Sequence, residues 1–156
     1  MKIERALLHP VTLCSIFLLV LNDHMLKELF PGFITGKLSD VAGMIFFPIV
    51  LAAFIQMLFP KVRSFEGRIV WCSALATAIV FVGVKTVHWA NELYAHVFGF
   101  TYSLVVNVET LLTDLSFGPI RKASLIMDPS DVWAVVFVFF PILLMSSQGN
   151  LSEGPV

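Results

Sequence analysis

Long apolar runs alternate with short polar or proline-containing segments along this chain of 156 residues. A helix needs about 20 mostly apolar residues to span roughly 30 Å of hydrocarbon. Four segments approach that length: residues 10–30, 41–59, 68–98 and 129–147. We therefore predict an all-α fold, an integral membrane bundle of four transmembrane helices, as a single domain over residues 1–148. Residues 149–156 are short and polar, and we expect a disordered tail there.

Capping residues and prolines indicate where these helices begin and end. Ser39 or Asp40 is expected to cap the second helix, and Pro60 to close it. Asp128 suits the N-cap of the fourth helix, because Pro129 then takes the first helical position.

An amphipathic pattern separates the third helix from the fourth. From residue 103 to residue 116, apolar side chains recur at helical spacing and polar side chains occupy the other side. We predict a helix that lies in the interface plane of the bilayer, the alternative being a lid over a polar site.

Composition agrees with a membrane location. Hydrophobic residues make up 58% of the chain and charged residues only 13%, against about 25% charged residues in soluble domains. The net charge of −1 argues against nucleic acid as a partner.

Cys14 and Cys72 lie in apolar runs and form neither a disulfide framework nor a zinc-binding spacing. Asn22 and Asp23 stand where a secretory signal would have a cleavage site, so the first helix is interpreted as retained.

Ionisable residues gather at one end of the predicted bundle. Alternating passes bring the end of helix one, the start of helix two, the end of helix three and the start of helix four to the same face. The residues at that face are Asp23, His24, Lys37, Asp40, Lys85, His88, Glu92, Asp128 and Asp131. Because charges near hydrocarbon are costly, such a cluster indicates a functional site.

The residue types at this face suggest acid/base chemistry or cation binding. The candidate catalytic residues are Asp23, His24, Asp40, His88 and Glu92. A histidine titrates near neutrality, and a neighbouring carboxylate can orient it. The candidate substrate-binding residues are Lys37, Lys85, Asp128 and Asp131. The lysines would hold an anionic group.

The cofactor is unknown from the sequence. The carboxylates form a rim able to bind a divalent cation through oxygen atoms, but the His-Glu-x-x-His zinc motif is absent. Nothing requires haem between His24 and His88. The same residues also have structural interpretations as helix caps, as a solvated helix face, or as pairs four apart such as Asp23 with Lys27 and His24 with Glu28.

The order of these residues resembles that of the small VanZ-like membrane proteins of bacteria. Lys37 and Asp40 form a Lys-x-x-Asp start to helix two, Glu92 stands near the outer end of helix three, and Asp128 and Asp131 form an Asp-x-x-Asp start to helix four. The chain lacks the family's histidine soon after the first aspartate and the arginine close before the aspartate pair.

A second signature reads Asn-Asp-His-x-Leu-Lys through Gly-Lys-Leu-Ser-Asp and is similar to one in uncharacterised small bacterial multi-pass membrane proteins. These resemblances imply a bacterial membrane protein and bring no established activity.

The loop charges and the predicted site lead to expectations for the topology and the function. The basic residues of the loops divide evenly between the two sides, and those before the first helix favour cytoplasmic N and C termini. We expect a protein of the bacterial inner membrane whose site lies at the outer leaflet and hydrolyses or transfers a lipid or lipid-linked head group. A non-enzymatic accessory or assembly subunit, binding a partner membrane protein, is the alternative. Ion or proton transport is a further one.

Overall fold

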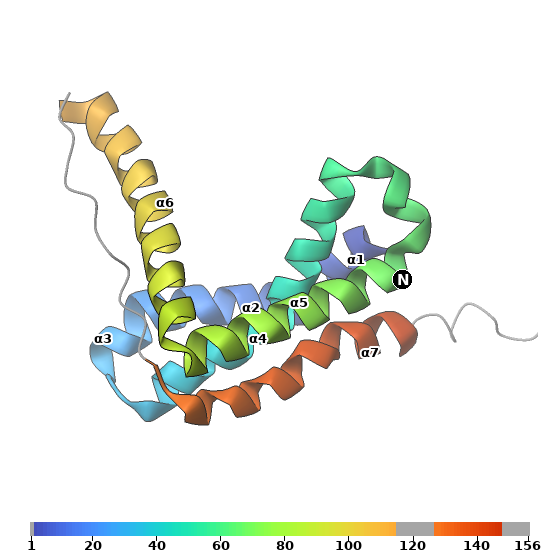
Figure 1. The fold of residues 1–156 in the computed structure, drawn as a ribbon, viewed down its shortest axis with the longest axis horizontal. Coiled ribbons are helices and arrows are strands. Elements are labelled where there is room, and N and C mark those ends of the chain that lie inside the picture. Colours follow the sequence, from blue (N-terminus) through green and yellow to red (C-terminus); the bar gives the residue numbers. More distant parts are fainter. Residues whose placement is uncertain (1, 115–126, 148–156) are drawn as a thin grey trace, which may run out of the picture. The chain divides into compact units, whose positions relative to one another are not determined.

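The computed structural model describes residues 2–114 and 127–147, which form helices and short connections without a β-strand among them (Figure 1). In chain order the elements are α1 (Ile3–Leu7), α2 (Pro10–Leu21), the π-helix η1 (Asn22–Leu26), α3 (Lys27–Leu29), α4 (Phe33–Leu58), the 3₁₀-helix η2 (Pro60–Phe65), α5 (Glu66–Thr86), α6 (His88–Asp114), the 3₁₀-helix η3 (Pro129–Phe139) and α7 (Phe140–Ser147). The predicted all-α class is confirmed.

The chain divides into two compact units, each described here by itself. Unit 1 contains the described residues up to Phe81 and those from Asp131 onwards, and unit 2 runs from Val82 to Ser130.

Three helical stretches are long and apolar enough to cross a membrane: Pro10–Leu29, Phe33–Leu58 and Pro60–Thr86. The stretch Pro129–Leu144 is apolar but shorter. These helices are those of a membrane protein. The count of four spans remains a prediction, because only three candidates of full length occur among residues 2–114 and 127–147.

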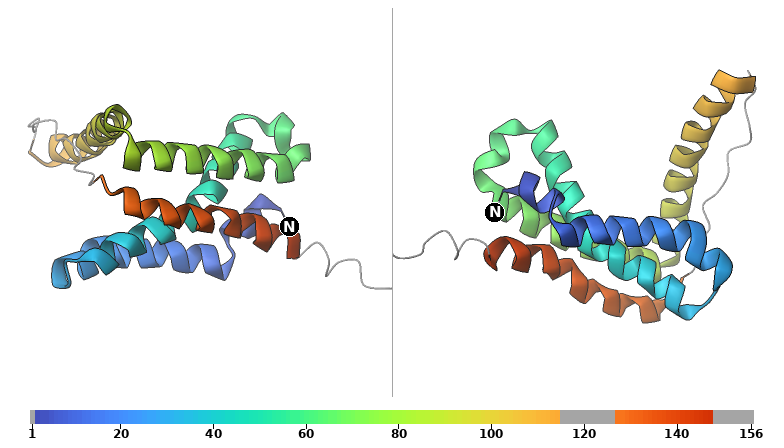
Figure 2. Two further views of the ribbon diagram at one scale, coloured as in Figure 1. Left: turned by 60° about the horizontal axis from the view of Figure 1, so that its bottom comes forward. Right: turned by 180° about the vertical axis from the view of Figure 1, so that it is seen from behind.

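Small side chains fill the interior of unit 1. α2 and α4 lie side by side, and α7 packs along α4 (Figure 2). Ala52, Ala74 and Ala134 have no exposed surface, and the last two pack with Met44 and Val138 to join α4, α5 and η3. Small residues let membrane helices approach closely, so the bundle is held by close backbone contact.

Large apolar side chains face outward from the same helices. The exposed fraction is 67% for Phe17 in α2, 51% for Phe54 in α4 and 71% for Val136 in η3. Such a surface would be unfavourable in water but suits hydrocarbon. The outer face of unit 1 therefore has the composition expected of lipid-facing helices.

The second helix starts earlier than the sequence predicts. α4 begins at Phe33 instead of residue 41, because Thr35 Oγ1 accepts a hydrogen bond from the Gly32 backbone N–H at 3.2 Å, as in a capping box. The prediction that Ser39 or Asp40 caps this helix is therefore wrong, and both residues lie inside α4.

The third helix is interrupted at Val87, within the predicted range 68–98. Backbone hydrogen bonds still run from Val87 N–H to Gly83 O at 2.8 Å and from Asn91 N–H to Val87 O at 3.0 Å. The Asn91 side chain donates to Val84 O at 3.1 Å and so satisfies a carbonyl near the end of α5. The interruption is thus a local one, stabilised by a side chain.

α6 continues to Asp114, so residues 103–114 belong to this helix and do not form a separate one. Ser103 and Asn107 are buried there. The location of this stretch in the interface plane stays a prediction. Residues 115 and 116, the basic residues Arg121 and Lys122 and the tail 149–156 lie outside the described residues.

The predicted start of the fourth helix is confirmed at its cap. Asp128 Oδ1 accepts a hydrogen bond from the Ser130 N–H at 2.9 Å, and the helix begins at Pro129. Its first part is a 3₁₀-helix that runs to Phe139.

Candidate functional site

Asn22 is the centre of a hydrogen-bonded group at one end of unit 1. Its side chain has no exposed surface. Its Nδ2 donates to Thr35 O and to Ser39 Oγ, both at 2.7 Å. Thr35 and Ser39 stand four apart on α4 and therefore on one face of the helix. One asparagine thus joins η1 to the start of α4.

The hydrogen bonds around Asn22 continue from the interior of unit 1 to its surface. Ser39 Oγ already accepts from Asn22, and its hydroxyl donates to Asp23 Oδ1 at 2.6 Å. Lys27 Nζ lies 2.7 Å from the same oxygen, and the Asp23 side chain is 44% exposed. We call Asn22, Asp23, Lys27, Thr35 and Ser39 the polar cluster. It ends at a carboxylate that is fixed by two donors and still open to the outside.

One acceptor of the polar cluster lacks a donor. Asn22 Oδ1 is buried and has no hydrogen-bond partner within the described parts of the chain. The reversed amide orientation would place this oxygen against the Thr35 carbonyl, so the hydrogen bonds of Nδ2 determine the orientation. Buried acceptors are nearly always paired, and Asn22 Oδ1 is therefore suited to receive a hydrogen bond from a water or a ligand.

The π-helical segment places these residues. η1 spans Asn22–Leu26, between α2 and α3. Short π-helical insertions occur frequently at functional sites, because they change which side chains share a helix face. Asn22 accordingly points to the interior while the next residue, Asp23, is exposed.

Lys37 and Asp131 form a buried ion pair near the same end of α4 as the polar cluster. Lys37 Nζ bonds Asp131 Oδ1, and the two side chains are only 10% and 9% exposed. The Lys37 amine also lies 4.5 Å from the centroid of the Phe33 ring. The pair joins α4 to η3. The charge of Lys37 is therefore balanced by a carboxylate of the same unit.

The remaining predicted residues of unit 1 differ in exposure. His24 is exposed on η1 and makes no hydrogen bond to the polar cluster within the described residues, nor does it pair with Glu28 there. Asp40 is half-buried in α4. Across residues 2–114 and 127–147, no three His, Cys, Asp or Glu side chains are grouped so that they could hold a metal ion.

Four predicted site residues belong to unit 2. Lys85 is buried near the end of α5, and Asp128 caps η3. His88 Nε2 lies 3.3 Å from Glu92 Oε1 on α6, and the two side chains are 79% and 63% exposed. The pairing of His88 with Glu92 is thus present, while the convergence of unit 2 residues with Asp23 and Lys37 stays a prediction.

Sequence reasoning missed the roles of Thr35 and Ser39. The sequence predicts Ser39 as a helix cap, whereas the structure places it inside α4. The available signal was the spacing of four between Thr35 and Ser39, together with Asn22 directly after an apolar run.

Comparison with protein-family models, curated proteins and solved structures finds no match to this chain. The resemblance to VanZ-like proteins stays a prediction from the sequence. Function is therefore inferred from the chemistry of the polar cluster and from the helices that hold it.

Proposed function

We propose that this membrane protein binds a lipid or lipid-linked head group at the polar cluster, at the outer leaflet, and hydrolyses or transfers it. One observation carries the proposal: the exposed carboxylate of Asp23 is held by Ser39 Oγ at 2.6 Å and by Lys27 Nζ at 2.7 Å. It lies near the end of the candidate span Pro10–Leu29, and Ser39 lies near the start of the next one, Phe33–Leu58. A lipid head group occupies this depth in a bilayer.

The cluster has the groups that acid/base chemistry on a head group requires. The Asp23 carboxylate would accept the proton of an attacking water molecule, and a base held in position in this way typically contributes about 10²–10⁴ in rate. Lys27 places a positive charge 2.7 Å from the Asp23 carboxylate and so helps to fix its position. His24, exposed on the same helical segment, would be a separate general acid that donates a proton to the leaving group.

The test is native mass spectrometry of protein released gently from detergent, with and without the Asp23 carboxylate. We expect one head-group class on the wild-type chain and a change in its amount or its chemical form in Asp23→Asn and Ser39→Ala. Glu28→Gln is the matched control, because Glu28 is an exposed carboxylate of the neighbouring α3. Identical spectra for all four proteins would overturn the proposal.

A non-enzymatic accessory subunit is the second candidate, and the buried pair of Lys37 with Asp131 favours it. Polar side chains that satisfy one another inside a bundle hold its helices together without any substrate. The same mass spectra discriminate between the two functions. Partner proteins in fixed stoichiometry, without an enriched head-group class, would replace the enzymatic proposal by this one.

A further inference from the structure

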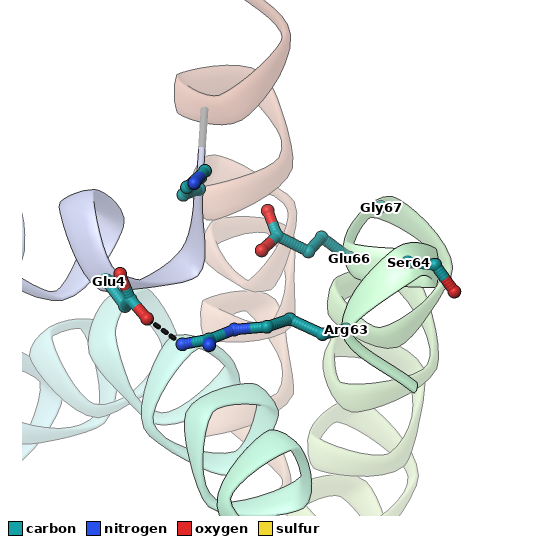
Figure 3. Close-up of a pocket in the computed structure, with 6 residues that line it drawn as sticks. Glu4, Arg63, Ser64, Glu66 and Gly67 are labelled. Atoms are coloured by element: carbon teal, nitrogen blue, oxygen red, sulfur yellow. Dashed lines mark hydrogen bonds and ion pairs between the residues drawn. The ribbon is translucent and has the colours of Figure 1, made fainter. Parts of the chain in front are cut away.

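A cavity of about 600 Å³ lies at the other end of α4 from the polar cluster. Its lining residues are Lys2, Glu4, Arg63, Ser64, Glu66 and Gly67 (Figure 3). They come from the start of α1, from η2 and from the first turn of α5. Small-molecule sites in proteins usually measure roughly 300–1,000 Å³, so the cavity is large enough for a head group.

Buried contacts hold the walls of this cavity in place. Ile3, next to two of the lining residues, is 1% exposed and packs against Ala52, in a core that Val62 of η2 also contacts. Thr12 Oγ1 donates to Ala6 O at 2.7 Å and so ties α1 to α2. The short helix α1 is therefore anchored to the bundle on its buried side.

The lining carries charges of both signs. The Glu4 carboxylate and the Arg63 guanidinium form an ion pair and point toward one another across the cavity (Figure 3). Glu66 points toward the same space from α5. Within the described residues, neither the Lys2 amine nor the Glu66 carboxylate has an ion-pair partner. The cavity thus offers one unmatched positive group and one unmatched negative group.

The position of the cavity along the helices selects the kind of ligand. The candidate span Phe33–Leu58 ends there and the span Pro60–Thr86 begins there, so a bilayer crossed by both spans would have its boundary with water at the cavity. Large apolar side chains near this boundary are exposed: the exposed fraction is 72% for Leu8, 60% for Phe59 and 52% for Phe65. A ligand with a charged head and apolar chains matches both features.

We propose that the cavity binds the head group of a phospholipid in which a phosphate stands beside a primary ammonium, as in phosphatidylethanolamine. The phosphate pairs with Lys2 and with N–H groups of Arg63, and the ammonium donates to the Glu66 carboxylate. A quaternary ammonium has no N–H to donate, and a glycerol head group carries no positive charge. The cavity therefore distinguishes phosphatidylethanolamine from phosphatidylcholine and phosphatidylglycerol.

The experiment is native mass spectrometry of the full chain in detergent micelles that contain the three phospholipids in equal amounts. We expect one phosphatidylethanolamine per chain to survive release, at about tenfold the occupancy of phosphatidylcholine, as expected for one additional hydrogen bond of roughly 1.4 kcal/mol. Soluble phosphoethanolamine is added in a separate arm. It should compete weakly, because it lacks the apolar chains.

Variants separate the roles of the two unmatched charges. Glu66→Gln should bring the ratio of phosphatidylethanolamine to phosphatidylcholine close to one, whereas Lys2→Gln should lower the occupancy of all phospholipids. Lys61→Gln is the matched control, since Lys61 is an exposed cation of η2 outside the lining. Thermal unfolding of each variant shows whether it has kept its fold.

Three results would overturn the proposal: equal retention of the three phospholipids by the wild type, an unchanged ratio in a folded Glu66→Gln variant, or equally strong competition by soluble phosphoethanolamine. The first two results would show that the cavity does not select between head groups. The third would show that the cavity binds the free head-group compound as well as the lipid. The variants separate the two proposals, because Glu66→Gln and Lys2→Gln leave the polar cluster intact, whereas Asp23→Asn leaves the lining of the cavity intact.

Discussion

Lys37 Nζ and Asp131 Oδ1 form a buried ion pair across 94 positions of the chain. Removing one partner leaves the other charge unpaired in the interior, which typically costs about 3–5 kcal/mol, whereas replacing both by apolar residues is often neutral. We expect Lys37→Met to lower the thermal unfolding midpoint in detergent strongly, and the Lys37→Met/Asp131→Leu pair to restore most of it. Similar midpoints for the single and double variants would contradict this expectation.

Asn22→Ala should destabilise the junction between η1 and α4. The change removes two side-chain hydrogen bonds of 2.7 Å, and interhelical hydrogen bonds in membranes average about 0.6 kcal/mol each. A loss of about 1–2 kcal/mol is therefore expected, measured as the free energy of unfolding in mixed micelles. Ser146→Ala serves as control, because the exposed Ser146 hydroxyl bonds only a carbonyl three residues earlier. An equal effect of both variants would exclude the proposed cross-link.

Glu4→Gln should change stability by less than about 1 kcal/mol. Glu4 and Arg63 also form an ion pair, but their side chains are 62% and 63% exposed, so water screens the attraction. The same unfolding measurement applies. A loss as large as that of Lys37→Met would mean that α1 depends on this pair and not on the burial of Ile3.

Ala134→Leu should disrupt the contact of η3 with α4 and α5. Ala134 has no exposed surface and packs against Met44 and Ala74, so added methyl groups overpack the interior at a cost of about 1–3 kcal/mol. Val136→Leu enlarges a side chain of the same helix that is 71% exposed, and it should have no measurable effect on the unfolding midpoint. Equal behaviour of the two variants would mean that η3 does not pack as described.

The thiol of Cys72 should resist a water-soluble maleimide in intact membranes. Cys72 is exposed on α5 inside the candidate span Pro60–Thr86, and a water-soluble maleimide does not enter the hydrocarbon that would surround this position. In a Cys14→Ala background we expect labelling only after denaturation. Ser64→Cys, made with Cys72→Ala as well, should label readily, and from the cytoplasmic side if the N terminus is cytoplasmic. Rapid labelling of Cys72 would argue against this span.

The apolar runs are sufficient to predict the helices. The polar contacts depend on where each helix starts and how the helices pack, which hydropathy does not describe. The first helix ends before Pro31, as expected, because proline and glycine follow it. Asp23 pairs with Lys27 at the predicted spacing of four. Lys37 and Asp131 were assigned to the same end of the bundle, but their pairing needs the actual packing of α4 against η3.

The errors have local causes. The predicted start of α4 at residue 41 is too late, because Ser39 and Asp40 are residue types that suit a helix cap, while the Thr35 hydroxyl caps the helix at Gly32. The π-helical turn at Asn22–Leu26 inserts an extra residue into the helix. A constant step of 100° per residue therefore does not describe which side chains of α2 and α3 share a helix face.

The 3₁₀ geometry of η3 changes how far the last helical stretch reaches. If residues 129–144 were entirely α-helical, a rise of about 1.5 Å per residue would give roughly 24 Å, short of the approximately 30 Å hydrocarbon thickness. The 11 residues of η3 rise by about 2.0 Å each instead. With the first residues of α7, the stretch then extends to about 30 Å. The tighter winding thus lengthens this short apolar segment, and the predicted fourth crossing depends on that added length.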